Sequence, residues 1–186
     1  MRDEIHRIAS IEAFERYREG QLTVRHYFLA DLPRDAVIDE PFDAPCVYLL
    51  RLDLSRELEP TIRAIPNRLD SMGILYIGGH PSGLRTSRFN KLLNACRSAE
   101  NKFEQVGYAA NDARHAHPVA SCLTTSLLRV GFRSSQCVLD LVKSDERVDE
   151  LELIIGYQEQ FHHLPPWNAV RGGASSYRRS ATHTSQ

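Results

Sequence analysis

Several patterns that mark other classes of protein are missing from this chain. No apolar run approaches the roughly 18 residues that a membrane-spanning helix requires, so we expect no membrane span. The charged first residues also give no reason to expect a secretory signal. Neither a glycine-rich phosphate loop nor a Ser–His–Asp pattern is present, which removes the best-known signatures of nucleotide hydrolases and serine hydrolases.

Cysteine is scarce, and its spacing is irregular. The four cysteines form no C-x-x-C pair, which argues against a structural zinc site or a dithiol redox site. Each lies among apolar neighbours, as buried free thiols do in reducing compartments. We therefore predict a cytoplasmic protein with four unpaired cysteines, namely Cys46, Cys96, Cys122 and Cys137.

A large excess of charge of one sign is also missing. The chain has 23 basic and 24 acidic residues, a net charge of −1, so overall charge gives no indication of nucleic-acid binding. The charge is unevenly distributed, because residues 1–44 are acidic whereas residues 84–102 hold five basic residues and one acidic residue. This basic stretch is either a solvated helix face or a phosphate-binding surface, and it contains Arg85, Arg88, Lys91, Arg97 and Lys102.

The length of 186 residues predicts a single domain with additions at its ends. Prolines and acidic residues crowd the stretch 30–45, which suggests a boundary near residue 44. We expect an N-terminal extension over 1–44, a folded domain over 45–170 and a disordered tail over 171–186.

Apolar patterning predicts the secondary structure. Ser10 is a candidate N-cap for a short helix that ends before Gly20. Strands are expected over 22–29, 47–52, 74–77 and 136–142, the second and third forming a hairpin. Further helices are expected over 87–100, 119–130 and 145–161.

The last predicted helix carries an unusual carboxylate. At 100° per residue, Glu150 falls inside the apolar face formed by its neighbours three to eleven positions later, whereas Glu152 falls on the polar face. A carboxylate directed into an apolar face is costly unless it is paired, protonated or bound to a metal. Glu150 is therefore either the partner of a buried cation or a functional group.

Five short blocks occur in order along the chain and resemble the motifs of the GIY-YIG nuclease family. Val47-Tyr48-Leu49 resembles the first motif, and Leu75-Tyr76-Ile77-Gly78 matches the second. Leu84-x-x-x-Arg88-Phe89 resembles the arginine block, and Glu150-x-x-Leu153-Ile154-x-x-Tyr157 resembles the glutamate helix. The closing block is Pro165-Pro166-Trp167-Asn168, so the resemblance covers about residues 46–168.

The resemblance implies an α+β fold in which a small, mainly antiparallel three-stranded sheet is flanked by helices. It also implies hydrolysis of phosphodiester bonds in DNA with Mg²⁺ or Mn²⁺. Glu150 would hold the metal, and Arg88 would pair with the scissile phosphate. Tyr48 would orient the attacking water or take its proton, Tyr76 would hold water or phosphate, and Asn168 would position the other groups.

Other residues and readings stay open at this point. Arg85 competes with Arg88 for the arginine role, and His80 is a possible auxiliary group beside the second tyrosine. Branched or damaged DNA, a second copy of the chain and a protein partner are all candidate partners. The alternative function is a nucleic-acid-binding or interaction module that retains the fold without cleaving. For DNA contacts outside the catalytic centre, the expected residues are Arg85, Lys91, Arg97 and Lys102.

Overall fold

The fold is seen in a computed structural model, which describes most of the chain between the two termini. The predicted tail and most of the predicted loop at 30–45 lie outside the described residues, as do the side chains of residues 80–91. Described are residues 2–32, 46–66, 69–80, 86–108, 119, 122–143 and 149–168.

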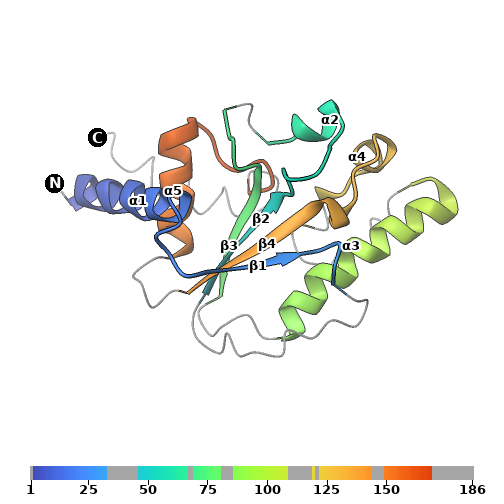
Figure 1. Cartoon of the computed structure of the whole chain (residues 1–186), viewed down its shortest axis with the longest axis horizontal. Helices are drawn as coiled ribbons and strands as arrows, with labels where there is room; N and C mark the ends of the chain where they lie inside the picture. The colour runs from blue at the N-terminus through green and yellow to red at the C-terminus, as the bar shows by residue number, and fades with distance from the viewer. Residues whose placement is uncertain are drawn as a thin grey trace, which may run out of the picture.

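An antiparallel sheet forms the centre of the molecule (Figure 1). Its strand order is β1-β4-β2-β3. The strands are β1 (Val24–Phe28), β2 (Cys46–Leu52), β3 (Ile74–His80) and β4 (Cys137–Lys143). The predicted hairpin is confirmed, because β2 and β3 are antiparallel neighbours, and the short helix α2 (Pro60–Arg63) lies in their connection.

The expected α+β class is confirmed, and the sheet has four strands where the resemblance implied three. The fourth strand, β1, comes from the N-terminal extension and pairs with β4 over its full length, from Val24 opposite Val142 to Phe28 opposite Val138. The boundary inferred from the prolines near residue 44 therefore separates two segments of one sheet. A local composition shift does not reveal a pairing between strands more than 100 residues apart in the chain.

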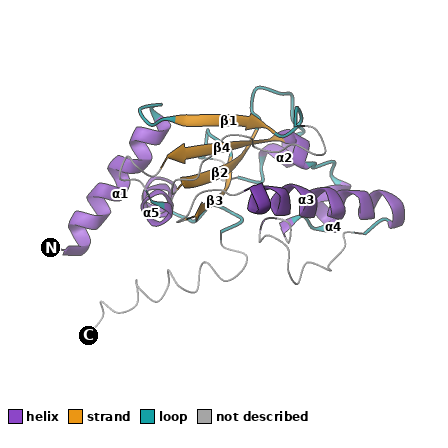
Figure 2. Ribbon diagram, turned by 90° about the horizontal axis from the view of Figure 1, so that it is seen from below, coloured by secondary structure: helices purple, strands orange, loops and turns teal. Residues whose placement is uncertain are grey.

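Two apolar cores lie on opposite faces of the sheet because β2 and β4 alternate buried side chains between them. Helices α3 (Thr86–Val106) and α4 (Thr125–Arg129) are associated with one core, to which α3 contributes Leu92, Leu93 and Cys96. Helices α1 (Arg2–Arg18) and α5 (Glu150–Phe161) cover the other face. Figure 2 shows these helices distributed around the sheet.

Helix α1 begins nine residues earlier than its sequence suggested. Ser10 is not an N-cap but a buried residue in mid-helix, where its hydroxyl donates to the carbonyl oxygen of His6 over 2.8 Å. This side-chain bond to the preceding turn satisfies the hydroxyl inside the helix. The predicted end is confirmed, because Gly20 follows the helix with a φ of +70°, a conformation that favours glycine.

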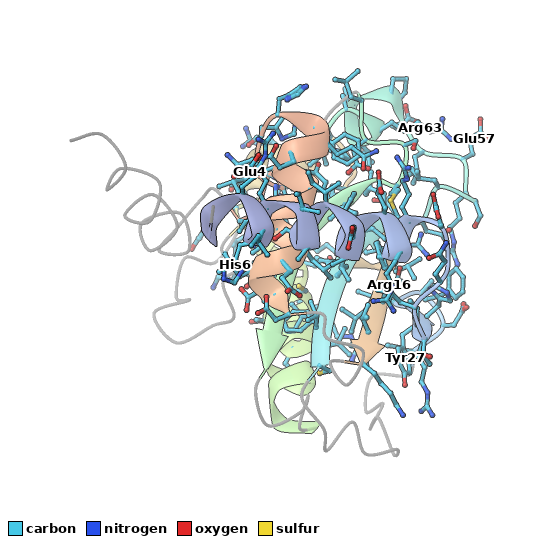
Figure 3. The ribbon with its side chains drawn as sticks, turned by 90° about the vertical axis from the view of Figure 1, so that its left-hand side faces the viewer. Glu4, His6, Arg16, Tyr27, Glu57 and Arg63 are labelled. Carbon is cyan, nitrogen blue, oxygen red and sulfur yellow. The ribbon has the colours of Figure 1, made fainter. Side chains whose placement is uncertain are left out.

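Helix α1 lies across α5, as Figure 3 shows. The crossing is close because Gly156 has no side chain, and a Cβ there would clash with the backbone of Ser10 and with Phe14. An ion pair of 2.7 Å between Arg7 and Glu159 lies at the surface of the same crossing. The extension is thus packed against the domain by a helix as well as a strand.

The prediction of buried, unpaired cysteines is confirmed for all four positions. Burial raises the pKa of the Cys96 thiol to about 12. In the part of the chain that is described, no helix combines the length and apolar character needed to cross a membrane.

Candidate active site

The two tyrosines of the resembling motifs meet over a glycine of β3. Tyr48 on β2 lies opposite Gly78 in the strand register, and the residue is 3% exposed. A Cβ on Gly78 would lie 2.6 Å from the Tyr48 Cζ atom and 2.7 Å from Cε1 of Tyr76. The two rings are tilted, with centroids 5.9 Å apart. Glycine at this position therefore provides the space in which both rings pack.

The next glycine provides space for the glutamate. A Cβ on Gly79 would lie 2.9 Å from both Cβ and Oε2 of Glu150. Glu150 is the first residue of α5, so its side chain extends from the positive end of the helix dipole. The inward direction expected for this side chain agrees with its place over the sheet.

Glu152 has a different role, in agreement with its predicted place outside the apolar face. Its carboxylate accepts from the backbone N–H of Asp149 over 3.1 Å, and Asp149 accepts from the N–H of Glu152 over 2.8 Å. This reciprocal arrangement is a capping box that fixes the start of α5. Since Glu150 is the next residue after the N-cap, the capping box also fixes where Glu150 lies.

The tyrosines and the glutamate reach β3 from opposite faces. Tyr48 belongs to the core that includes α3, whereas Glu150 extends from α5 on the other face. Strand β3 is the last strand of the sheet, and its consecutive glycines place no side chain between the two groups. Three segments distant in sequence thus bring phenol and carboxylate groups to adjacent residues of one edge strand.

Asn168 completes the outer edge of β3. Its Oδ1 accepts from the backbone N–H of Ile77 over 2.9 Å, and its Nδ2 donates to the Ile77 carbonyl over 2.7 Å. The backbone N–H of Trp167 donates to Leu75 over 2.9 Å. The amide therefore pairs with β3 as a neighbouring strand would. Asn168 is 7% exposed, so the structure places it as a positioning residue for the strand that carries Tyr76 and the glycines.

Several predicted site residues lie outside the described side chains. Arg88 occupies the first turn of α3, which begins six residues after the end of β3, but its side chain is not described. The same holds for the side chains of His80, Arg85 and Lys91. The choice between Arg85 and Arg88 accordingly stays open.

The two described cations on α3 make contacts within the chain. Arg97 donates through Nη2 to the carbonyl oxygen of Leu32 over 3.2 Å. The Lys102 ammonium lies 5.9 Å from the centre of the Tyr108 ring. Both side chains are also partly accessible to solvent. Their role in DNA binding therefore stays a prediction.

Glu150 is the described residue that suits a hard divalent cation. A single carboxylate, with water and phosphate oxygens completing the shell, is a common way for proteins to bind Mg²⁺. The side chain is partly exposed and lies beside the backbone of Gly79. Among the described residues, no cluster of three or more metal-binding side chains occurs.

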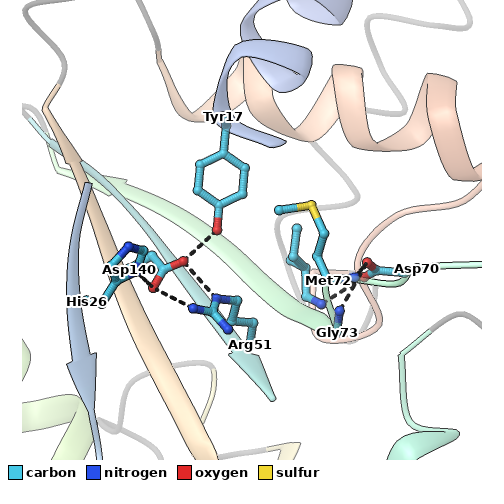
Figure 4. A network of polar contacts seen from close by, with 8 residues as sticks. Tyr17, His26, Arg51, Asp70, Met72, Gly73 and Asp140 are labelled. Carbon is cyan, nitrogen blue, oxygen red and sulfur yellow. Dashed lines mark hydrogen bonds and ion pairs between the residues drawn. The ribbon is translucent and has the colours of Figure 1, made fainter. Parts of the chain in front are cut away.

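A polar cluster that the sequence analysis did not single out lies elsewhere on the sheet (Figure 4). Asp140 of β4 is 1% exposed and accepts from the Tyr17 hydroxyl over 2.7 Å and from Arg51 Nε over 2.8 Å. His26 Nδ1 lies 2.7 Å from its other oxygen. The available signal was a lone charge inside an otherwise apolar strand, which occurs at both Arg51 and Asp140.

The cluster changes the proton affinity of its members. Burial, with the nearby Asp140 carboxylate, raises the pKa of the Tyr17 phenol well above its ordinary value. For Arg51, burial lowers the pKa, but the hydrogen bonds and charge of Asp140 outweigh it and raise the pKa. Tyr17 therefore stays neutral and Arg51 stays cationic across the usual pH range.

Comparison of the chain with family models, with curated proteins and with solved structures returns no match. The candidate site accordingly depends on the sequence motifs and on the geometry around Gly78 and Gly79.

Replacing Gly78 with alanine is expected to destabilise the protein by about 1–3 kcal/mol, because the added methyl group overpacks the two tyrosine rings. The φ of Gly78 is not positive, so backbone strain adds nothing. Gly131→Ala is the matched control, since its φ is +87° and nothing lies within 4 Å of the new Cβ. Both variants should unfold at lower urea concentration, but only Gly78→Ala should alter the near-ultraviolet circular dichroism of tyrosine. Unchanged spectra in both would contradict the packing described here.

Proposed function

We propose that the chain is a metal-dependent endonuclease of the GIY-YIG type, hydrolysing phosphodiester bonds in DNA. The observation that carries the proposal is the packing of Tyr48, Tyr76 and Glu150 against the consecutive glycines of β3. These residues come from separate blocks of sequence, and each block resembles a motif of that family. Their contact with adjacent residues of one edge strand supports a common role.

Hydrolysis requires an activated water and relief of the negative charge that develops on the phosphate. In the proposed mechanism, Tyr48 orients the attacking water or takes its proton, and Tyr76 holds the water or a phosphate oxygen. The ordinary pKa of a tyrosine is about 10, so proton transfer to Tyr48 needs a cation near the phenol. The water oxygen forms the new bond to phosphorus while the bond to the leaving alkoxide breaks.

The remaining roles follow from charge and geometry. Glu150 would hold Mg²⁺ or Mn²⁺, and the metal would supply positive charge to offset the negative charge of the phosphate. Arg88 pairs its planar guanidinium with two phosphate oxygens, with Arg85 as the alternative and His80 as an auxiliary group. Asn168 keeps β3 in register and thereby positions Tyr76.

DNA is the proposed partner, and the basic stretch along α3 is the proposed contact surface outside the catalytic centre. Lys91, Arg97 and Lys102 lie on this helix, which begins close to the end of β3. Phosphate contacts by such residues would be independent of base sequence and sensitive to salt. A second copy of the chain would be needed to cut both strands in one encounter.

A plasmid-nicking assay tests this function. Supercoiled DNA is incubated with the purified protein in Mg²⁺, in Mn²⁺ or in a chelator, beside flapped and branched DNA of defined length. We expect nicks with 3′-hydroxyl or 3′-phosphate ends in the presence of metal and none in the chelator. Tight DNA binding without cleavage of any substrate would favour the alternative, a nucleic-acid-binding module that retains the fold. If the protein neither binds nor cleaves any of these substrates, both functions are contradicted.

A further inference from the structure

An open cleft of about 540 Å³ lies beside the polar cluster of Figure 4, between the end of α1 and the sheet. Its size falls in the range of pockets that hold small molecules. Neither Gly78 nor Gly79 lines it, so it is separate from the candidate active site. Its lining combines fixed cationic groups with an apolar wall.

Arg51 offers the cleft one unused edge of its guanidinium. The edge formed by Nε and Nη2 faces Asp140, with distances of 2.8 Å to Oδ2 and 3.4 Å to Oδ1. The opposite edge, formed by Nη1 and Nη2, donates to no acceptor among the described residues. Two parallel N–H groups on that edge match the two oxygens of a carboxylate or phosphate. The side chain is 22% exposed, so this edge can be reached from the cleft.

The surrounding groups hold this edge in place and add positive charge. Asp140 also binds His26 Nδ1, which turns the Nε2 atom of the half-exposed ring away from the carboxylate. Arg18, at the end of α1, is exposed at the rim of the cleft. The cleft is lined by two arginines and by one carboxylate, Asp140, which already accepts from Tyr17 and Arg51, so the cleft has an excess of positive charge and of N–H donors.

Part of the remaining lining is apolar. It includes Leu22, Val24 of β1, and Met72. We propose that this cleft binds a small organic anion, a carboxylate or phosphate monoester whose oxygens meet Arg51 and whose apolar part lies on Leu22, Val24 and Met72. The proposal does not rest on the endonuclease function.

Titration of the ¹⁵N-labelled full chain with benzoate, phenyl phosphate and the neutral benzyl alcohol tests the proposal. Both anions are expected to shift the amide signals of Gly20, Leu22, Ser71 and Met72 at millimolar concentration, whereas benzyl alcohol is expected to bind at least tenfold more weakly. Overturning results are shifts confined to Gly78 and Gly79, shifts that are as large with benzyl alcohol, or no shift at all. Because the readout is local, a failure here is distinct from a failure to cleave DNA.

A charge-conserving variant links the binding to the guanidinium. Arg51→Lys keeps a cation beside Asp140 but lacks the second donor edge, so affinity for benzoate should fall at least about tenfold. Arg63→Gln on α2, an exposed arginine outside the cleft, should leave the affinity unchanged. If Arg51→Lys does not fold, His26→Gln replaces it, with an expected loss of about threefold because one donor is altered at the rim. Unaltered affinity in the folded variant would overturn the assignment of the site.

Discussion

Metal-dependent nicking by the Glu150→Gln variant is expected to be at least about 100-fold slower than that of the unmodified protein. Glutamine has nearly the same shape as glutamate, so the packing against Gly79 and the start of α5 should be preserved. What changes is the negative charge, and with it the attraction for a divalent cation. Initial rates measured over a range of Mg²⁺ concentrations test this, because a weakened metal site also shifts the concentration needed for half of the maximal rate.

Glu152→Gln is the matched control, since it makes the same chemical change two residues away. Glutamine at position 152 can still accept from the Asp149 N–H through its amide oxygen, so Glu152→Gln should keep the capping box and change stability by less than about 0.5 kcal/mol, with nicking within a few-fold. The two variants are therefore expected to differ in activity and not in stability. Equal loss of nicking in both would point to the helix start rather than to the metal. Full nicking by Glu150→Gln would remove Glu150 from the mechanism.

The parts of the fold that follow from local patterns were predicted well. Short apolar runs bounded by polar loops indicated the strands, because a strand that is buried on both faces is apolar along most of its length. The helical angle of Glu150 indicated that its carboxylate faces the sheet rather than solvent. Within the candidate site, the motifs predicted Tyr48 and Tyr76. That Gly78 and Gly79 leave space for the tyrosine rings and for Glu150 is seen only in the structure.

The parts that depend on distant segments were not predicted. Pairing of β1 with β4 joins residues separated by more than 100 positions, and no local pattern specifies such a partner. Ser10 looked like an N-cap because its type is common there, but the close crossing with Gly156 makes it a small interior residue instead. Asn168 was predicted as a site residue. Its hydrogen bonds to the backbone of β3 were not predicted, because nothing in the local sequence around Asn168 indicates which strand it contacts.

Asp140→Ala is expected to lower the free energy of unfolding by about 3–5 kcal/mol, the largest effect on stability that the structure predicts. The carboxylate is 1% exposed and accepts from three side chains that lie on α1, β1 and β2. Its removal leaves the Arg51 cation and the buried Tyr17 hydroxyl without their acceptor. The variant therefore tests how strongly the N-terminal extension is attached to the rest of the sheet.

Urea unfolding of three further variants separates this explanation from simple loss of a side chain. Asp31→Ala removes a carboxylate that is 74% exposed, so its effect should stay within about 0.5 kcal/mol. Replacing the whole pair, as in Arg51→Met with Asp140→Leu, should recover part of the stability lost in Asp140→Ala, because no unpaired charge is left buried. Tyr17→Phe should cost about 1 kcal/mol, the value of one hydrogen bond.

The double variant decides which property of the cluster matters. If it regains stability over Asp140→Ala, the penalty in the single variant comes from the stranded Arg51 cation, and the ion pair itself contributes little net stability. Stability would then not explain why the sheet contains this pair. The proposed binding of an anion by the second edge of the Arg51 guanidinium would explain it. If it regains nothing, the bonds from α1 and β1 to Asp140 are what hold the extension against β4, and the cluster is chiefly a structural joint.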